Sequence, residues 1–238
     1  MSEDLDSGSV GPKAVCWAIV VAAGAGLRLG ASIPKQFLTV AGRRVIDWSV
    51  TTAAEACRGN VVVVVPPDDV DKERASFGDS VRVVGGGDTR SASVRAGLAV
   101  VPDDCVVVVI HDAARPLVPL VVFERVVAAV LAGASAAIPG LPVVDTVKLV
   151  RAHPTFGSIV VETPPRDSLM AVQTPQAFSA RALRRAHEAG AEATDDASLI
   201  EALGLDVVVV AGDVLAKKLT NPEDVPWFEL HAGRRGGS

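Results

Sequence analysis

The chain has 238 residues, a length that suits one large domain or two small ones. Hydrophobic residues make up 49% and charged residues 21%, the balance of a globular protein with enough apolar side chains for a core. The net charge of −5 argues against a general nucleic-acid-binding surface, and no apolar stretch reaches the roughly 18 residues that cross a bilayer. We therefore expect a globular protein that binds neither nucleic acid nor membrane.

Neither the start of the chain nor its cysteines point to a targeting signal or a metal site. The first residues are acidic and rich in Ser and Gly, unlike the basic start of a signal peptide. We expect residues 1–13 to form a disordered extension, 14–230 to form one domain and 231–238 to form a flexible tail. The spacing of Cys16, Cys57 and Cys105 fits no metal motif, so we expect reduced thiols in a cytoplasmic protein without a protein-bound metal.

Short apolar runs, mostly β-branched, alternate with helix-like segments along the chain. The runs predict strands at Trp17–Ala22, Val61–Val65, Val81–Val84, Val106–Ile110, Ala136–Ile138 and Val207–Val210. The segments between them predict helices at Val45–Cys57, Ser91–Val100, Leu120–Ala132, Ala180–Ala189 and Asp195–Leu203. Because continuous apolar runs suit strands that are covered on both faces, we expect an α/β fold with a doubly wound, mostly parallel, Rossmann-like sheet.

The stretch 142–173 breaks this alternation. Two β-like segments, 145–150 and 158–163, lie on either side of Pro154 and Gly157. This pattern predicts two strands joined by a loop, forming a β-arm that projects from the sheet. Because a projecting arm leaves strand edges exposed, which often pair with another subunit, we expect the arm to form a homodimer.

A glycine-rich turn, AAGAGLRLG, follows the first predicted strand. Backbone N–H groups in such a turn can approach phosphates closely. The turn is not a dinucleotide fingerprint, because Leu29 stands where the third glycine belongs, and it lacks the GK[ST] of a Walker loop. A purely structural turn is the alternative. Arg28 and Lys35 favour a phosphate site, since two cations can stabilise charge on a triphosphate and on departing pyrophosphate.

A second candidate position follows the predicted strand Val106–Ile110. His111 and Asp112 come at its carboxyl end, where open α/β sheets bind ligands. Asp112 can hydrogen-bond a ribose hydroxyl or hold a Mg²⁺-bound water, and the alternative is a cap on the turn before Pro116. A single histidine is more often structural than catalytic, so His111 is left out of the catalytic set.

Two adjacent acidic residues precede the last predicted helix. Asp195 and Asp196 follow Thr194 and come directly before an apolar run. This arrangement is typical of a helix N-cap, in which a carboxylate accepts hydrogen bonds from backbone N–H groups of the first turn. We interpret the pair as structural.

Motifs recur in a fixed order from residue 22 to residue 224. They are AAGAGLRLGASIPKQFL from Ala22, GGGDTRSASV from Gly85, HDAARP from His111, DTVK from Asp145, QTPQAF from Gln173, TDDAS from Thr194 and KLTNPED from Lys218. In this order they resemble the motifs of the 2-C-methyl-D-erythritol 4-phosphate cytidylyltransferases of the non-mevalonate isoprenoid pathway. The resemblance implies a nucleotidyltransferase that joins CMP from CTP to this small sugar-alcohol phosphate and releases pyrophosphate.

The resemblance also implies roles for individual residues. The catalytic cations are Arg28, Lys35, Arg166 and Lys218. The nucleotide is bound by Ala22, Ala23, Gly24, Ala25, Gly26, Gly87, Asp88, Ser93, Asp112 and Ala113. Methylerythritol phosphate is held by Arg115, Thr146 and Thr174, together with Arg166, and some of these side chains come across the dimer interface on the arm. Mg²⁺ is the expected cofactor, bound mainly through the CTP phosphates.

Two departures and two alternatives accompany this assignment. Leu27 stands where relatives often have a basic residue, and Pro164-Pro165 replaces a segment that is commonly polar.

A ribitol 5-phosphate cytidylyltransferase is the nearest alternative, which Ala114 and Lys148 disfavour. A non-catalytic nucleotide-binding module is the other alternative. It is disfavoured because a sensor does not need cations for both a leaving group and a second anionic substrate, as Arg28, Lys35, Arg115, Arg166 and Lys218 would provide.

Overall fold

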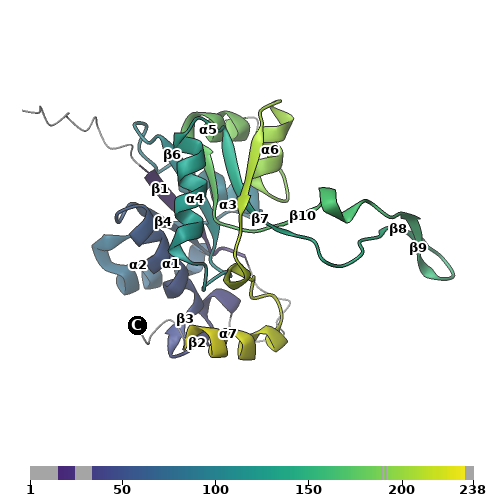
Figure 1. Ribbon diagram of the computed structural model, residues 1–238. Coiled ribbons are helices and arrows are strands. Elements are labelled where there is room, and N and C mark those ends of the chain that lie inside the picture. The colour runs from purple at the N-terminus through teal and green to yellow at the C-terminus, as the bar shows by residue number, and fades with distance from the viewer. Residues whose placement is uncertain (1–15, 25–33, 189, 191, 234–238) are drawn as a thin grey trace, which may run out of the picture.

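A central sheet of eight strands organises the molecule, with helices packed on both of its faces (Figure 1). The structure is a computed structural model and describes residues 16–24, 34–188, 190 and 192–233. The predicted extension 1–13, the end of the predicted tail at 234–238, and the predicted site residues Ala25, Gly26 and Arg28 lie outside the described residues.

The parallel part of the sheet is built from the apolar runs that the sequence predicts as strands. In chain order these are β1 (Cys16–Val21), β4 (Val61–Val65), β5 (Arg82–Gly85), β6 (Val107–Asp112), β7 (Ala136–Pro142) and β12 (Val207–Ala211). Across the sheet they follow the order β5-β4-β1-β6, then β7 and β12 beyond one inserted strand. The predicted mostly parallel, doubly wound sheet is confirmed.

Antiparallel strands that the sequence analysis did not predict complete the sheet. β11 (Gln176–Ser179) lies between β6 and β7 and runs antiparallel to both. β10 (Met170–Val172) pairs with the other end of β7, also antiparallel. The register pairs Gln176 with Ile110, so the QTPQAF motif adjoins the end of β6 that carries Asp112. These strands are too short to give a periodic sequence signal.

The helices predicted from the sequence form close to their predicted bounds. They are α1 (Val45–Ala56), α3 (Arg90–Leu98), α4 (Leu120–Leu131), α5 (Ala180–Glu188) and α6 (Asp196–Ala202). α2 (Val70–Phe77) is largely polar and was not predicted from the sequence. Among the described residues, every helix falls short of the length and apolar character that a membrane crossing requires.

A further helix, α7 (Val225–Ala232), corrects the expected start of the tail. A flexible tail is predicted for 231–238, yet the helix includes His231 and Ala232. Ala232 is buried in a small apolar cluster with Phe228, and this packing stabilises the last turn of the helix. The short antiparallel pair β2 (Thr39–Val40) and β3 (Arg43–Arg44) lies next to α7.

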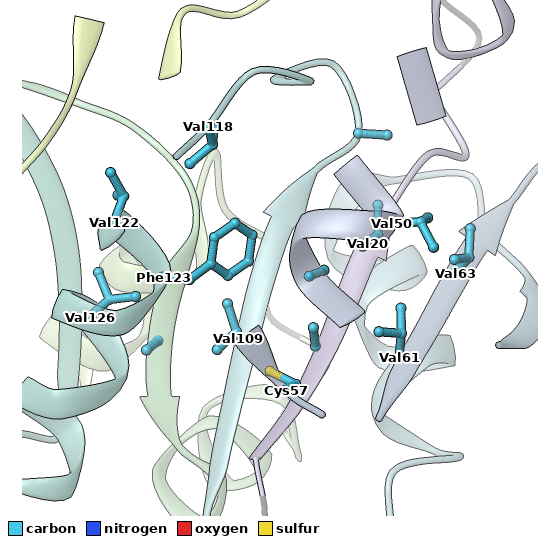
Figure 2. Close-up of a cluster of buried hydrophobic side chains, with 14 of the residues drawn as sticks. Val20, Val50, Cys57, Val61, Val63, Val109, Val118, Val122, Phe123 and Val126 are labelled. Atoms are coloured by element: carbon cyan, nitrogen blue, oxygen red, sulfur yellow. The ribbon is translucent and has the colours of Figure 1, made fainter. Parts of the chain in front are cut away.

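Alternate residues of β1 face opposite layers of helices. Ala18 and Val20 pack in the layer with α1 and α4, whereas Trp17 and Ile19 pack in the layer with α3 and α5. Because side chains alternate along a strand, a continuous apolar run is needed to fill both layers. Figure 2 shows the first layer, in which Phe123 of α4 lies among valines from the strands and helices.

The arm between β7 and β10 extends away from the sheet (Figure 1). Its tip is an antiparallel hairpin of β8 (Leu149–His153) and β9 (Gly157–Glu162). The first strand begins at Leu149 rather than at Asp145 as predicted, and residues 145–148 are irregular. Apolar side chains are exposed on both strands, including Val150 and Val160, and Phe156 in the turn is 75% exposed. A two-stranded hairpin is at best marginally stable in water, so this apolar surface is poorly supported within one chain.

Phe123 should contribute much of the stability of the first layer. It is fully buried and its ring lies 5.1 Å from that of His111. We expect Phe123→Ala to lower the free energy of unfolding by about 3–5 kcal/mol, because it removes buried surface and leaves a cavity. Urea denaturation at a fixed protein concentration would measure this change.

Leu131, at the end of the same helix, provides the matched control. Its side chain is 52% exposed, so Leu131→Ala should change the free energy of unfolding by less than about 1 kcal/mol. An equal loss of unfolding free energy in the two variants would contradict the placement of Phe123 in the core.

Candidate active site

A pocket of about 810 Å³ lies where β1, β5 and β6 end. This is the edge at which open parallel sheets bind ligands, and the volume suits a cofactor-sized molecule. The structure brings together many of the predicted site residues in its lining, namely Ala22, Ala23, Gly24, Lys35, Gly87, Asp88, Ser93, Asp112, Ala113 and Lys218. Backbone and small side chains thus come mainly from the strand ends. The charged side chains come from the end of β6 (Asp112), from a short 3-10 helix (Lys35) and from loops (Asp88 and Lys218).

Close backbone packing shapes the side of the pocket formed after β1 and β5. A Cβ atom on Gly86 would lie 2.3 Å from Cβ of Ala23, so only glycine permits the two turns to approach this closely. The side-chain amide of Gln36 donates to the carbonyl of Gly24 (3.2 Å). This bond ties the first turn to the short 3-10 helix Lys35–Phe37, which places Lys35 at the pocket.

The loop before α3 forms a second wall. Ser93 is buried, and its hydroxyl donates to the carbonyl of Thr89 (3.0 Å) and accepts from the N–H of Gly87 (3.2 Å). Thr89 is the N-cap of α3 and accepts from the N–H of Ala92 (3.0 Å). The start of the helix is therefore held at the pocket, where backbone N–H groups favour an anionic ligand.

Asp112, at the end of β6, lies between two cations. Its Oδ2 is 2.6 Å from Nζ of Lys218, and its Oδ1 is 3.8 Å from Nε of Arg90. Burial would raise the pKa of Asp112, but the opposing charges of Lys218 and Arg90 outweigh it and lower the pKa to about 2. The side chain is 14% exposed and carries a negative charge at neutral pH.

His111 and Thr174 support Asp112 from below the pocket. The hydroxyl of Thr174 accepts from the backbone N–H of Asp112 (3.0 Å) and lies 3.1 Å from Nδ1 of His111. Burial disfavours the charged imidazole and lowers the pKa of His111 to about 3, although Asp112 opposes the shift. His111 is thus neutral at physiological pH. Thr174, which the resemblance assigned to the substrate, is buried beneath the lining rather than in it.

The segment that carries Lys218 is docked onto the HDAARP motif. Leu219 donates its N–H to the carbonyl of Ala114 (2.7 Å), and Nη1 of Arg115 donates to the carbonyl of Ala216 (2.6 Å). Arg115 is largely buried, and this burial lowers its pKa although Asp112 opposes the shift. These bonds place Lys218 opposite Asp112, while Arg115 lies behind the segment and outside the pocket lining.

Thr146 and Arg166 are exposed on the arm and do not line the pocket of their own chain. Nη1 of Arg166 donates to the carbonyl of Val144 (3.1 Å), a contact within the arm itself. The arm extends away from the sheet (Figure 1). A single chain therefore does not bring these two predicted residues together with the rest of the site.

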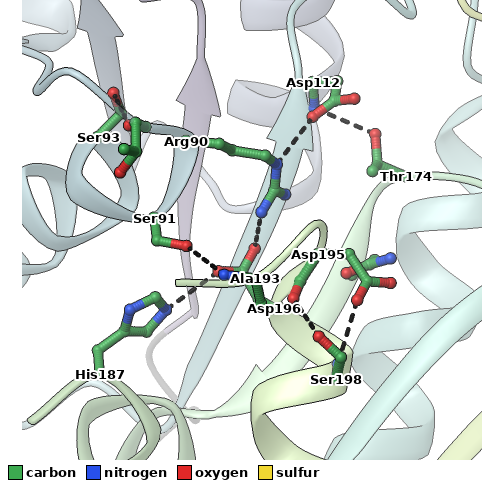
Figure 3. A network of polar contacts seen from close by, with 12 residues as sticks. Arg90, Ser91, Ser93, Asp112, Thr174, His187, Ala193, Asp195, Asp196 and Ser198 are labelled. Atoms are coloured by element: carbon green, nitrogen blue, oxygen red, sulfur yellow. Dashed lines mark hydrogen bonds and ion pairs between the residues drawn. The ribbon is translucent and has the colours of Figure 1, made fainter. Parts of the chain in front are cut away.

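The pocket also contains residues that the sequence analysis did not name. The polar ones are Gln36, Thr89, Arg90 and Thr220. Arg90 is the arginine of the GGGDTRSASV motif, so the motif already contained a signal for it. Its guanidinium reaches both Asp112 and Asp196, as Figure 3 shows.

The residues present fit a Mg²⁺ ion that arrives with a nucleotide. Two carboxylates, Asp88 and Asp112, line the described part of the pocket. Within the described ranges, no group of three or more His, Cys, Asp or Glu side chains is placed to hold a metal by itself. Mg²⁺ is commonly held by one or two carboxylates together with substrate phosphates, and this donor set matches that mode.

Comparisons with known proteins give one consistent answer. The family model described as IspD, 2-C-methyl-D-erythritol 4-phosphate cytidylyltransferase, matches residues 16–232. The 2-C-methyl-D-erythritol 4-phosphate cytidylyltransferase of Nocardia farcinica is 46% identical over 221 residues, covering 92% of this chain and 94% of the relative. The bifunctional enzyme IspD/IspF of Nitratidesulfovibrio vulgaris is 42% identical over 232 residues, covering 90% of this chain and 58% of that enzyme.

Solved structures agree with these sequence matches. The crystal structure of 4-diphosphocytidyl-2C-methyl-D-erythritol synthase from Anaerococcus prevotii matches with a TM-score of 0.79 at 28% identity, over 93% of this chain and 99% of that chain. The family model covers every described strand and helix of the fold. The chain therefore belongs to the 2-C-methyl-D-erythritol 4-phosphate cytidylyltransferase family.

Proposed function

We propose that the chain joins CMP from CTP to 2-C-methyl-D-erythritol 4-phosphate, with release of pyrophosphate, in the non-mevalonate isoprenoid pathway. The observation that carries the proposal is the pocket at the end of β6, where residues from separate family motifs gather around Asp112 and Lys218. Family membership gives the reaction, and the pocket provides the nucleotide-sized volume and cations that the reaction needs.

The nucleotide would lie along the backbone of the strand ends. Gly87, Asp88 and Ser93 would contact cytosine or ribose, and Asp112 and Ala113 would line the ribose and α-phosphate region. Ala22–Gly24, with Ala25 and Gly26, would meet the phosphates through backbone N–H groups. The cations Lys35, Lys218 and Arg28 would then lie along the triphosphate.

The chemical step is an in-line displacement. An oxygen of the methylerythritol phosphate attacks the α-phosphorus of CTP, and the bond from that phosphorus to the bridging oxygen breaks as pyrophosphate departs. The attacking phosphate is already ionised, so no general base is needed, in keeping with a neutral, buried His111. Lys35, Arg28 and Lys218 stabilise the charge that builds on the phosphoryl oxygens.

Mg²⁺ is the expected cofactor of this step. Asp112 would hold it, directly or through water, and the triphosphate would supply most of the other oxygen ligands. When bound, the ion neutralises phosphate charge and orients the leaving pyrophosphate. We also expect a cytoplasmic location, where Cys16, Cys57 and Cys105 would stay reduced.

The site is completed in a homodimer. Thr146 and Arg166 lie on the arm, and the arm presents exposed apolar side chains such as Val150, Val160 and Phe156. Pairing of arms between two subunits would cover this surface and bring the two polar residues to the partner's pocket. Arg166 and Thr146 would then form the region that holds methylerythritol phosphate, and Arg115 and Thr174 would support this region from behind the lining.

The activity itself is tested by offering two acceptors separately. With CTP and Mg²⁺, we expect pyrophosphate release with methylerythritol phosphate and little release with ribitol 5-phosphate. Release only with ribitol 5-phosphate would replace the acceptor while leaving the nucleotide site as assigned. Folded protein that releases pyrophosphate with neither acceptor would contradict the proposed reaction.

Two neighbouring lysines allow a matched test of the cationic site. Lys218 faces the pocket and Asp112, whereas Nζ of Lys217 lies 2.8 Å from Asp224 and outside the pocket lining. Lys218→Ala should lower kcat about 10²–10³-fold, because it removes charge stabilisation of the phosphates. Lys217→Ala should leave kcat within about twofold and act on stability only. Steady-state kinetics on both variants would show the difference, and similar effects on kcat would contradict the role given to Lys218.

Mixing variants tests whether the arm serves the partner subunit. Lys218→Ala damages the pocket and Arg166→Ala damages the arm, so each variant alone should have low activity. A mixed dimer contains one intact site, which combines the pocket of the Arg166→Ala subunit with the arm of the Lys218→Ala subunit. After unfolding and refolding an equal mixture, activity should therefore rise to about a quarter of the wild-type value, as expected for random pairing in a twofold dimer. Activity no greater than the average of the two separate variants would show that each arm serves its own chain.

A further inference from the structure

Behind the pocket, the side chains of Asp112, Arg90, Asp196 and His187 form a chain of polar contacts that leads into the core (Figure 3). His187 Nε2 lies 3.0 Å from Oδ1 of Asp196, and Nη1 of Arg90 lies 2.6 Å from Oδ2 of the same carboxylate. Arg90 in turn faces Asp112 at 3.8 Å. Residues of α5, α6 and α3 are thereby linked to the end of β6.

Asp196 is placed where a carboxylate is unfavourable without strong partners. Its side chain is 0% exposed, and burying an unpaired carboxylate is costly. Each of its oxygens has one of the two partners described above. Because a carboxylate only accepts hydrogen bonds, His187 must donate from Nε2. Nδ1 of His187 is buried and has no hydrogen-bond partner among the described residues.

Helix capping does not explain Asp196. Asp195 is the N-cap of α6, and its Oδ1 accepts from the N–H of Ser198 (3.1 Å). Asp196 is the first residue of the helix and directs its carboxylate to His187 and Arg90 instead. The two adjacent acidic residues of the TDDAS motif therefore have different partners, and only the first serves the end of the helix.

Arg90 is also at an unfavourable position for helix stability. It is the first residue of α3, where the helix dipole disfavours a positive charge, and Thr89 already caps the helix. It nevertheless lines the pocket with its side chain 25% exposed. Burial opposes the charged guanidinium, but Asp196 and Asp112 outweigh it and raise the pKa of Arg90. The negative charge of Asp196 thus offsets both unfavourable effects.

The distances indicate what Asp196 does for the pocket. Arg90 is closer to Asp196 than to Asp112, so the close partner of Asp112 is Lys218. If Asp196 lost its charge, Asp112 would be the one carboxylate left in an ion pair with the guanidinium among the described residues. Arg90 would then move toward Asp112 and compete with Lys218 for it.

We propose that Asp196 is a positioning residue for cytidylyl transfer, which holds Arg90 at the wall of the pocket so that Asp112 and Lys218 keep their arrangement for the nucleotide. The inference rests on the proposed function and deepens it, since it assigns a role to a buried residue that touches no substrate. His187 serves the same end by donating to the second oxygen of Asp196.

The test compares the effects of Asp196→Asn and Asp195→Ala on CTP use. Asp196→Asn keeps the shape of the side chain and removes its charge, and it should lower kcat/KM for CTP about 10- to 100-fold through misplaced binding groups. KM for methylerythritol phosphate should change less than about twofold, because Asp196 acts on the nucleotide side. Asp195→Ala removes the helix cap and should lower the Tm with kcat/KM unchanged. If both variants lost kcat/KM in proportion to Tm, Asp196 would be merely structural.

A double variant shows whether Asp196 acts through Arg90. In an Arg90→Gln background, the further change Asp196→Asn should have no additional effect on kcat/KM for CTP, because the group it positions is already absent. Effects that multiply would overturn the proposal. If Asp196→Asn does not fold, Arg90→Lys provides the same test. Lysine keeps the charge but lacks the fork that reaches both carboxylates, so kcat/KM should still fall, and an unchanged value would overturn the proposal.

The affinity for CTP, measured by calorimetry without the acceptor, separates this inference from the proposed function. If the wild-type protein transfers the cytidylyl group and Asp196→Asn equals it in turnover and in CTP affinity, the inference is overturned and the proposed function is not. Wild-type protein that binds CTP but transfers no cytidylyl group to methylerythritol phosphate would overturn the proposed reaction. In that case, weaker CTP binding by Asp196→Asn would still support the positioning role.

Discussion

The carboxylate of Asp112 is the group on which the arrangement of the pocket depends. It stands at the end of β6, a strand held between β1 on one edge and the antiparallel β11 on the other. Thr174, just before β11, accepts from its backbone N–H. Lys218, from a loop, and Arg90, from the start of α3, approach its oxygens. Because these partners come from segments far apart in sequence, the pocket forms only when the whole sheet is assembled.

The arm introduces a second constraint, since the described chain leaves two predicted site residues outside its own pocket. Thr146 and Arg166 lie on a two-stranded extension whose apolar side chains are exposed. Such a ribbon is poorly stabilised by itself, and association with a second subunit would bury it. In the proposed dimer the same contact that stabilises the arm also completes the acceptor site, so assembly and activity depend on each other.

The sequence predicts the parallel sheet well because its signal is local. Runs such as Val61–Val65 and Val106–Ile110 predict strands buried on both faces, and the helices between them follow from composition. The insertion of β11 between β6 and β7 could not be predicted, because Gln176–Ser179 is too short to show a period. The contacts of Arg90 and Lys218 with carboxylates 106 residues away have no local signature at all. The family motifs assign a role to Lys218, but they do not indicate that Arg90 pairs with Asp196.

Places where local rules fail are informative about function in this fold. A cation at the first residue of α3 and a fully buried carboxylate at the first residue of α6 each reduce stability when considered separately. Together Arg90 and Asp196 form one ion pair, and Nε of Arg90 faces Asp112. In the sequence, Asp195 and Asp196 look like one helix cap, yet the structure gives them separate tasks. Two individually unfavourable charges that pair with each other beside a pocket, one from α3 and one from α6, favour the proposal that the pair sets the geometry of the site.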